Sequence, residues 1–572
     1  MAFLAIAFTI LALPIGFFLW SAQCLARNCA IAKASGIPYI TRWVAPINPF
    51  WLLYGTSIVK FLQRFGLATD RLRRIYPFGW EANERATIHE EHGEMFLVAH
   101  PGGLQLCVAN AETIYDILQR RTDFRRNMEE FAVINVYGKN LATTDDQEWQ
   151  RHRKMTAVTF TEKNNELVWV QSLAQAKGML DYWLVEQKGG KAIRTVHDDT
   201  KIFTLNVLAA ALFDQPYPFE GYGKVDANKR SDDQSYQYRD SLGVILISVI
   251  QILVFGEEGL KAWWTPKSFK RASAAVATFR SYILTLMNEE RAHIAEKKPD
   301  RDNLVARLVR ACNEVQVDGP DKNVRNMTLT ETEIISNLFV YAFAGNDTTA
   351  VGLTNILIHM AANPETQDWI SEELNHYLSG SDPHAWTYDS FFKLKRCQAV
   401  IMESLRICHP LSQLVKTVNN TPQPIKVNDK SYTIPAGTSV HCSLPALHTL
   451  PRYWGSSAMT WNPSRFISTP GLEGKTATFE HEVLAPDTSE HFLPWAWGQR
   501  VCPGKRFSQA EIAAVLAVMF RDWKLDVVCE GGESPRQATE RAWRESLVID
   551  HEGHMLHEME APESIGLRWA RR

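Results

Sequence analysis

The fold is decided by the stretch Phe492-Leu493-Pro494-Trp495-Ala496-Trp497-Gly498-Gln499-Arg500-Val501-Cys502-Pro503-Gly504-Lys505-Arg506-Phe507. This loop, punctuated by proline and glycine, carries one cysteine and leads into an apolar-periodic run over 507–520 that predicts a helix. A cysteine at a loop-to-helix junction faces the positive end of the helix dipole and free backbone N–H groups. Both favour the thiolate form of Cys502, which is the form that binds a metal. The alternative is a buried thiol that only fills space.

The aromatic and charged residues of the same loop suit a flat, acidic cofactor. Trp495 and Trp497 offer indole rings for stacking, and Arg500 offers a fork-shaped cation for carboxylates. Gly498 and Gly504 allow a close approach to the backbone that a Cβ would block. We therefore expect a cofactor to lie against this loop.

The pattern Trp-x-x-Gly-x-Arg-x-Cys-Pro-Gly, here residues 495–504, resembles the haem-binding loop of the cytochrome P450 superfamily. That family more often has Phe where this chain has Trp495. The resemblance implies that Cys502 is the axial thiolate on the iron of haem b. The continuation Cys-Pro-Gly-Lys-Arg-Phe-Ser-Gln-Ala-Glu is most similar to fungal microsomal members, which commonly act in secondary metabolism.

The composition is that of an ordinary globular protein. The chain has 572 residues, of which 45% are hydrophobic and 22% charged. Its formal net charge of -3 provides no basic excess to replace phosphate counterions, so we expect no binding to nucleic acid. The nine cysteines are odd in number and lack paired spacing, which favours reduced thiols in a cytosol-facing protein.

The first residues predict a membrane anchor. Residues 1–26 carry no charged side chain, and about 20 apolar residues span a bilayer core. Positive charge follows at Arg27 and Lys33, which places the remainder of the chain in the cytosol. The alternative, a cleaved signal peptide, normally has its positive charge first. By resemblance we expect a single pass through the endoplasmic reticulum membrane, a proline-containing linker over 27–55, and a haem-thiolate catalytic domain over 56–572.

The rest of the chain predicts a mainly α fold with small β-sheets (α+β), the cytochrome P450 fold, behind an N-terminal transmembrane helix. The runs 95–100 and 104–110 flank Pro-Gly-Gly and predict a hairpin. The polar stretch 224–240 predicts a loop, and 330–362 predicts the longest helix. The uncharged run 242–255 is too short to span a membrane; it packs in the core or lies against the bilayer.

The apolar pattern of the longest helix breaks at Ala344-Gly345-Asn346-Asp347-Thr348-Thr349. The hydroxyl of Thr348 can bond back to a carbonyl, and Asp347 beside it offers a short proton route. An exposed polar patch is the alternative. The segment resembles the Ala-Gly-x-Asp-Thr-Thr of the family, which implies that Thr348 holds the water network at bound dioxygen and that Asp347 helps to deliver protons.

Two further motifs follow the family order. Glu403 and Arg406 stand at i and i+3 on a predicted helix, a spacing that usually decorates a solvated face. Trp-Asn-Pro-Ser-Arg-Phe at 461–466 resembles the family element that completes a triad, so the resemblance implies that Glu403, Arg406 and Arg465 brace the core under the haem loop. Losing one partner of such a buried triad costs on the order of 3–5 kcal/mol.

Trp149 and Arg153 are four residues apart and share a helical face, so both can reach one anionic group. The alternative is a cation–π pair at the surface. The segment resembles the Trp-x-x-x-Arg helix of the family, which implies that this anion is a haem propionate, with Arg500 as another donor and Lys416 as a further basic partner. A basic face for an acidic redox partner, or a solvated charge run, is offered by Arg151, His152, Lys154, Lys505 and Arg506.

The resemblance implies a haem-dependent monooxygenase that inserts one oxygen atom from O2 into an apolar small molecule. Its electrons would come from NADPH through a separate flavin-containing reductase, because the chain has no convincing flavin or nicotinamide site. The first alternative is a haem-thiolate isomerase or dehydratase that rearranges a peroxide without a reductase. The second is a non-catalytic haem-binding membrane protein.

Overall fold

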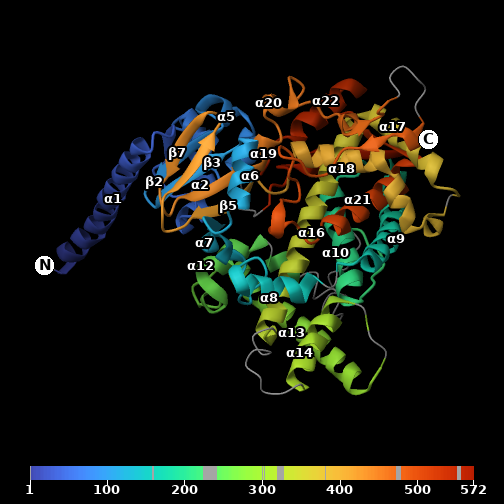
Figure 1. The fold of residues 1–572 in the computed structure, drawn as a ribbon, viewed down its shortest axis with the longest axis horizontal. Coiled ribbons are helices and arrows are strands. Elements are labelled where there is room, and N and C mark those ends of the chain that lie inside the picture. The colour runs from blue at the N-terminus through green and yellow to red at the C-terminus, as the bar shows by residue number, and fades with distance from the viewer. Residues whose placement is uncertain are drawn as a thin grey trace.

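The structure of the chain is a computed structural model that describes residues 2–157, 160–222, 241–245, 247–298, 301, 303–317, 328–380, 382–471, 478–550 and 556–572, without the side chains of 2–12, 133 and 311–317. Figure 1 shows a large helical body beside a smaller region that contains the main sheet. The α-helices are α1 (Ala2–Ala34), α2 (Pro49–Arg64), α3 (Asp70–Ile75), α4 (Trp80–Glu84), α5 (Thr87–His92), α6 (Ala111–Gln119), α7 (Met128–Phe131), α8 (Asp146–Ala157), α9 (Glu162–Glu186), α10 (Val196–Phe213), α12 (Val249–Leu260), α13 (Lys267–Ala295), α14 (Leu304–Val317), α16 (Glu331–Ala362), α17 (Pro364–Tyr377), α18 (Lys395–Ile407), α19 (Leu444–Leu447), α20 (Pro451–Trp454), α21 (Lys505–Phe520) and α22 (Pro535–Ser546). Short 3-10 helices connect them: η1 (Ala132–Ile134), η2 (Gln187–Gly189), η4 (Pro383–Ala385), η5 (Tyr388–Lys393), η6 (Pro463–Phe466), η7 (Phe479–His481), η8 (Gly498–Arg500) and η9 (Pro562–Ser564).

The strands confirm the predicted mainly α fold with small sheets. They are β1 (Tyr39–Thr41), β2 (Met95–His100), β3 (Gly103–Val108), β4 (Phe124–Arg126), β5 (Gln413–Val418), β6 (Gln423–Val427), β7 (Lys430–Ile434), β8 (Ser439–Ser443), β9 (Ile467–Ser468), β10 (Val483–Leu484), β11 (Trp523–Val527) and β12 (Leu567–Arg571). The main sheet has six strands in the order β1-β2-β3-β8-β5-β4, and the other strands form the pairs β6–β7, β9–β10 and β11–β12. The predicted hairpin is present, because β2 and β3 pair antiparallel with His100 opposite Gly103.

Helix α16 runs through the helical body (Figure 1) and matches the helix predicted over 330–362, although α1, with 33 residues, is one residue longer than the 32 of α16. Thr330 caps its first turn in a reciprocal capping box with Glu333, and the helix ends at Ala362, before Pro364. Helix α10 packs closely along it. A Cβ at Gly345 would lie 2.9 Å from Leu208 Cδ2 of α10, so any larger residue would require the Leu208 side chain to move.

The N-terminal region differs from the predicted anchor and linker. Helix α1 continues past residue 26 to Ala34, and β1, inside the predicted linker 27–55, pairs parallel with β2 of the main sheet. The Asn28 side chain also donates to the His100 carbonyl at 2.8 Å. The sheet therefore begins earlier than residue 56. In the part of the chain that the structure describes, no helix is both long and apolar enough to cross a membrane.

The uncharged run 242–255 is partly buried and partly exposed. Val249, Ile250 and Ile252 are buried, whereas Ile247 and Leu253 are exposed. The helix α12, which contains the second half of this run, has non-helical backbone at Gly256, with φ 64° and ψ 167°. It contacts α13, η1 and α2. The predicted loop over 224–240 lies outside the described residues.

Candidate active site

The cysteine loop enters helix α21 directly. The Cys502 backbone N–H donates to the Trp495 carbonyl at 2.9 Å, which folds the loop back on itself before Lys505 begins α21. The Cys502 side chain is exposed, yet protein atoms surround it closely enough that burial raises the pKa of its thiol. A hydrogen bond from the Gly504 backbone N–H and the charges of Arg153 and Lys505 act in the opposite direction, toward the thiolate.

The two tryptophans of the loop have different surroundings. Trp495 is buried, and its indole N–H donates to Ser508 Oγ of α21 at 3.2 Å. The Trp497 ring lies against Tyr115 of α6, with 4.4 Å between the ring centroids. Trp497 therefore anchors the loop to α6.

Arg500 of the cysteine loop lies near two further cations, Arg126 and Lys416, and near the carboxylate of Asp145. Arg126 of β4 and Lys416 of β5 are directly opposite in the sheet, an arrangement that is unfavourable for like charges. Burial and the charge of Arg500 lower the pKa of Arg126 to about 9. Burial likewise lowers the pKa of Lys416 and of Arg500, although Asp145 opposes both shifts. The Arg126 Nε is buried and has no hydrogen-bond partner among the described residues. This excess positive charge fits a ligand that carries carboxylates.

Arg126 was not predicted from the sequence. What indicates a role in anion binding is its position opposite Lys416, and that position is known only once β4 and β5 are paired. The Arg126 guanidinium also lies over the Phe131 ring of α7 at 3.6 Å from the ring centroid. One side chain therefore connects the cation group to the segment that follows β4.

Trp149, Arg153 and Arg500 come together as the motif implies, but with a different pairing. The Arg500 guanidinium lies over the Trp149 ring at 4.3 Å from its centroid, so the cation that stacks on Trp149 is Arg500 and not the Arg153 of the alternative interpretation. Arg500 also donates to Asp145 Oδ1 at 2.6 Å, to the Thr144 carbonyl at 2.9 Å and to the Leu141 carbonyl at 3.3 Å. The charge of Arg153 acts on both Cys502 and Arg500.

Thr348 and Asp347, in the polar break of α16, have different surroundings. Thr348 Oγ1 donates to the Ala344 carbonyl at 2.6 Å, the back-bond expected from the sequence, and Ala344 is exposed. Asp347 is buried, and its Oδ1 accepts from Asn346 Nδ2 at 3.0 Å. Thr204 of α10 donates to Asn346 Oδ1 at 2.7 Å and so fixes the orientation of that amide.

The structure brings Glu403, Arg406 and Arg465 together. Arg406 donates to the two Glu403 oxygens at 2.7 and 2.9 Å, and Arg465 Nε donates to Glu403 Oε1 at 3.0 Å. Glu403 and Arg406 are completely buried, so they do not decorate a solvated face. The remaining Arg406 N–H groups donate to the carbonyls of His448 at 2.8 Å and Ala458 at 2.6 Å.

Two histidines connect this triad to the cysteine loop, and neither was predicted. His448, whose carbonyl accepts from Arg406, uses its ring Nε2 to accept from the Leu493 backbone N–H at 3.0 Å. The His409 ring, just beyond α18, lies 2.8 Å from the Pro494 carbonyl. Both contacts reach the start of the loop, so the triad supports the loop through a hydrogen-bonded path. The sequence gives no signal for them, because the partners lie far apart in the chain.

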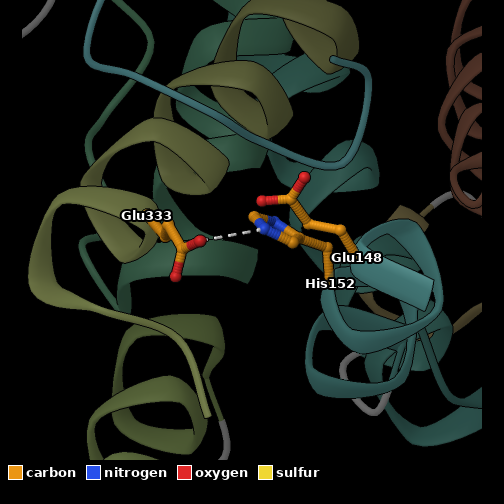
Figure 2. A group of neighbouring side chains, drawn as sticks. All are labelled: Glu148, His152 and Glu333. Carbon is orange, nitrogen blue, oxygen red and sulfur yellow. Dashed lines mark ion pairs between the residues drawn. The ribbon is translucent and has the colours of Figure 1, made fainter. Parts of the chain in front are cut away.

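Figure 2 shows Glu148, His152 and Glu333, whose ligand atoms all lie within 4.8 Å of one another, as in a metal site. The protonation of His152 opposes metal binding. Asn337 Oδ1 accepts from the Leu141 N–H at 2.9 Å, so Asn337 Nδ2 must be the donor to His152 Nδ1, at 2.9 Å. The proton then sits on His152 Nε2, which faces Glu333 Oε1 at 3.4 Å and has no lone pair for a metal.

The predicted basic face loses two of its members. His152 is buried, and Arg151 is paired with Glu333, with 2.5 Å between its Nη2 and the carboxylate. Lys154 is exposed, Lys505 pairs with Asp487 at 2.6 Å, and Arg506 lies over the Phe391 ring. Of the five predicted members, Lys154 is the one that is exposed and has no ion pair among the described residues.

Comparisons with known proteins agree with this arrangement. A family model described as "Cytochrome P450" matches residues 82–554. The chain is 26% identical to a cytochrome P450 monooxygenase of Arthrobotrys oligospora over 91% of this chain and 92% of that protein. It is 24% identical, over 94% of each chain, to the phomenoic acid biosynthesis cluster cytochrome P450 monooxygenase of Leptosphaeria maculans. The crystal structure of a cytochrome P450, CYP102L1, has the same fold, with a TM-score of 0.65 at 16% identity, covering 86% of this chain and 98% of that one.

Proposed function

The chain belongs to the cytochrome P450 family, and from that membership we propose a haem monooxygenase that inserts one oxygen atom from O2 into an apolar small molecule. The observation that carries the proposal is the exposed Cys502 thiol at the start of α21, supported by the Gly504 N–H. The cations Arg126, Lys416 and Arg500 lie beside this loop, and Thr348 lies on a partly open face of α16.

The residues present fit the haem b that the family implies. Cys502 would supply the iron ligand, and Arg126, with its buried Nε unpartnered within the described chain, would bind a propionate together with Arg500 and Lys416. The Trp149 ring packs against the Arg500 guanidinium and helps to hold it in place. Thiolate-ligated haem supplies the activation of dioxygen.

The chain itself supplies protons and their control. Because the Thr348 proton is donated to the Ala344 carbonyl, Thr348 Oγ1 offers lone pairs, and it suits the role of an acceptor for a water proton. The buried Asp347 carboxylate, held by Asn346, is the nearest acidic group along the chain. We assign to Asp347 the delivery of protons and to Thr348 the orientation of the water that receives them.

The electrons would come from NADPH through a separate flavin-containing cytochrome reductase. Lys505 and Arg506 follow Cys502 directly in the chain, and we propose that an acidic partner docks beside them. The Leptosphaeria relative, which is named for a biosynthetic cluster, supports a role in secondary metabolism.

We place the protein on the endoplasmic reticulum membrane, with its catalytic domain in the cytosol. Support comes from an exposed aromatic surface, which we define as Trp43, Phe50, Tyr54, Phe61, Trp263 and Trp264. Three of these residues recur at i, i+4 and i+11 on one face of α2, which packs against α12. Aromatic rings of this kind suit the interface between water and lipid. The uncharged residues 2–26 precede this surface and would add an anchor.

The test is the reduced carbon monoxide spectrum of the purified protein. The wild-type protein is expected to show the absorbance band of thiolate ligation, and Cys502→Ala is expected to lose it. Cys529→Ala, which changes another exposed cysteine, is the matched control and should keep the band. A band that survives in Cys502→Ala would refute the assignment. Product formation that requires NADPH and reductase would separate this function from peroxide rearrangement and from a non-catalytic haem protein.

A further inference from the structure

One face of α16 faces helix α8. Asn337, Tyr341, Ala344 and Thr348 recur at i, i+4, i+7 and i+11, which places them along one stripe of the helix. The first two contact α8, and the last belongs to the polar break described above. The stripe therefore joins the α8 contact to the polar break in the middle of the same helix.

Two hydrogen bonds connect the helices at equivalent positions. Asn337 Nδ2 donates to His152 Nδ1 at 2.9 Å, and one turn along both helices Tyr341 Oη donates to Thr156 Oγ1 at 2.8 Å. All four side chains are buried. A shift of α8 by one helical turn would break both bonds at once, so the pair fixes the register of α8 against α16.

The His152 ring is hydrogen-bonded at Nδ1 by Asn337, and its other nitrogen lies near Glu333. Its Nε2–H faces Glu333 Oε1 at 3.4 Å, and Arg151 binds both oxygens of Glu333. Figure 2 shows the His152 ring between the Glu333 carboxylate of α16 and the backbone of α8. The orientation of this ring thus depends on donor groups from both helices.

Asn337 also reaches the cation group through the backbone. Its Oδ1 accepts from the Leu141 N–H at 2.9 Å, and the Leu141 carbonyl accepts from Arg500 Nη1 at 3.3 Å. Its Nδ2 bonds to the Glu333 carbonyl at 2.6 Å as well as to His152. A single buried amide therefore contacts α8, the segment that holds Arg500, and its own helix.

We propose that Asn337 is a positioning residue of the monooxygenase proposed above, which sets Trp149, Arg153 and Arg500 at a fixed distance from Thr348 along α16. The inference rests on that proposed function. Asn337 does not touch the reacting atoms in this arrangement. It acts through His152 on α8 and through Leu141 on Arg500, so both sides of the site are aligned from one point.

The first experiment replaces the amide by an apolar group of similar size, Asn337→Leu, in the full-length holoenzyme with reductase and a turned-over substrate. We expect product formed per NADPH consumed to fall on the order of tenfold, because misplacement by fractions of an ångström is costly in catalysis. Asn355→Leu is the matched control, since Asn355 is a buried amide of the same helix with no hydrogen-bond partner in the described chain. It should leave this ratio unchanged.

The second experiment uses Asn337→Asp, which keeps an oxygen for the Leu141 N–H but replaces the Nδ2 donor to His152 Nδ1 with an acceptor. We expect product formed per NADPH consumed to fall in this variant as well, because the hydrogen bond to α8 is lost while the contact toward Arg500 is kept.

The outcomes separate the positioning role from the proposed function. A wild-type protein without the thiolate band and without NADPH-dependent product would remove the monooxygenase assignment itself. With both present, unchanged coupling in Asn337→Leu would overturn the positioning role. If Asn337→Leu does not fold, wild-type coupling in Asn337→Asp would overturn it instead.

Discussion

At the scale of single residues, the site is defined by charges that the folded chain leaves without full compensation. Arg126 and Lys416 are opposite neighbours in the sheet, and Arg500 adds a third cation beside them. Asp145 is the one carboxylate that acts on all three among the described residues. Such an arrangement is unfavourable for the protein alone and favourable once an anion binds.

This excess of positive charge predicts that Arg126→Met weakens haem binding but stabilises the haem-free protein. In Arg126→Met we expect haem to dissociate faster by on the order of tenfold, because a charge-assisted hydrogen bond to a carboxylate is lost. The haem-free protein should become more resistant to unfolding, because a cation with a buried, unpartnered Nε is removed. Haem transfer to an acceptor globin and the unfolding midpoint of the haem-free protein measure the two effects.

The neighbouring residue on the same strand provides the control. Arg125 points to the other face of β4, where it is 47% exposed and lies 3.6 Å from Asp146. Arg125→Met should change neither the rate of haem loss nor the stability of the haem-free protein appreciably, since exposed ion pairs contribute little. Equal behaviour of the two variants would contradict an anion site at Arg126.

The sequence predicted the residues whose identity is set by local chemistry. Cys502, Thr348 and Glu403 each stand in a recognisable short pattern, and the structure places each in the surroundings described above. Arg126, Asn337 and His448 carry no such pattern. Their contacts join strands and helices separated by tens or hundreds of residues, so they become visible only when the chain is folded.

At the scale of elements, helix limits were predictable where capping signals were strong. Thr330 and Pro364 bound α16 as expected, and Asn110 caps α6 by accepting from the Thr113 N–H. Which face of each helix is buried was less predictable. On α8, Arg151 and His152 looked like surface charges, yet both turn toward Glu333 because α16 crosses there.

The contact between α8 and α16 predicts an acid sensitivity. Burial alone would raise the pKa of Glu333, but hydrogen bonds from His152, Arg151 and the Thr330 N–H outweigh it and hold the pKa far below its ordinary value of 4.5. A carboxyl whose pKa is depressed on folding stabilises the fold above its unfolded pKa, and this contribution is lost as the pH falls below 4.5. Glu333 should therefore make the helix contact weaker in acid.

The measurement compares the apparent midpoint of thermal unfolding at pH 7 and below pH 4.5, at one scan rate. Glu333→Gln should lower the midpoint at pH 7 by on the order of 2 °C and should reduce the acid-induced loss seen in the wild-type protein. Glu331→Gln serves as the control, because Glu331 is half exposed in its pair with Arg291. A Glu333→Gln variant as acid-sensitive as the wild-type protein would rule out this source.

At the scale of the whole molecule, the sequence predicted a membrane-bound protein with an anchor, a linker and a body, and the structure changes the division between them. Tyr39–Thr41 is an edge strand of the main sheet, so the prolines over 38–49 shape part of the body. Strand pairing of so short a segment has no periodic signal in the sequence. Figure 1 shows α1 projecting away from this body on the side of the sheet.

The aromatic surface predicts how the body contacts the membrane. Trp263 is 89% exposed and Trp264 58% exposed directly after α12, and α12 contacts α2, which carries Phe50, Tyr54 and Phe61. Rings held in water at one side of the body would gain free energy at a lipid interface. A protein that lacks residues 1–26 should therefore still sediment partly with neutral phospholipid vesicles, and the further change Trp263→Ser with Trp264→Ser should release it. Val170→Ser with Val185→Ser on α9, far from α2 in Figure 1, removes exposed apolar groups elsewhere and should not release it. If both double variants sediment equally, the membrane contact lies elsewhere on the molecule.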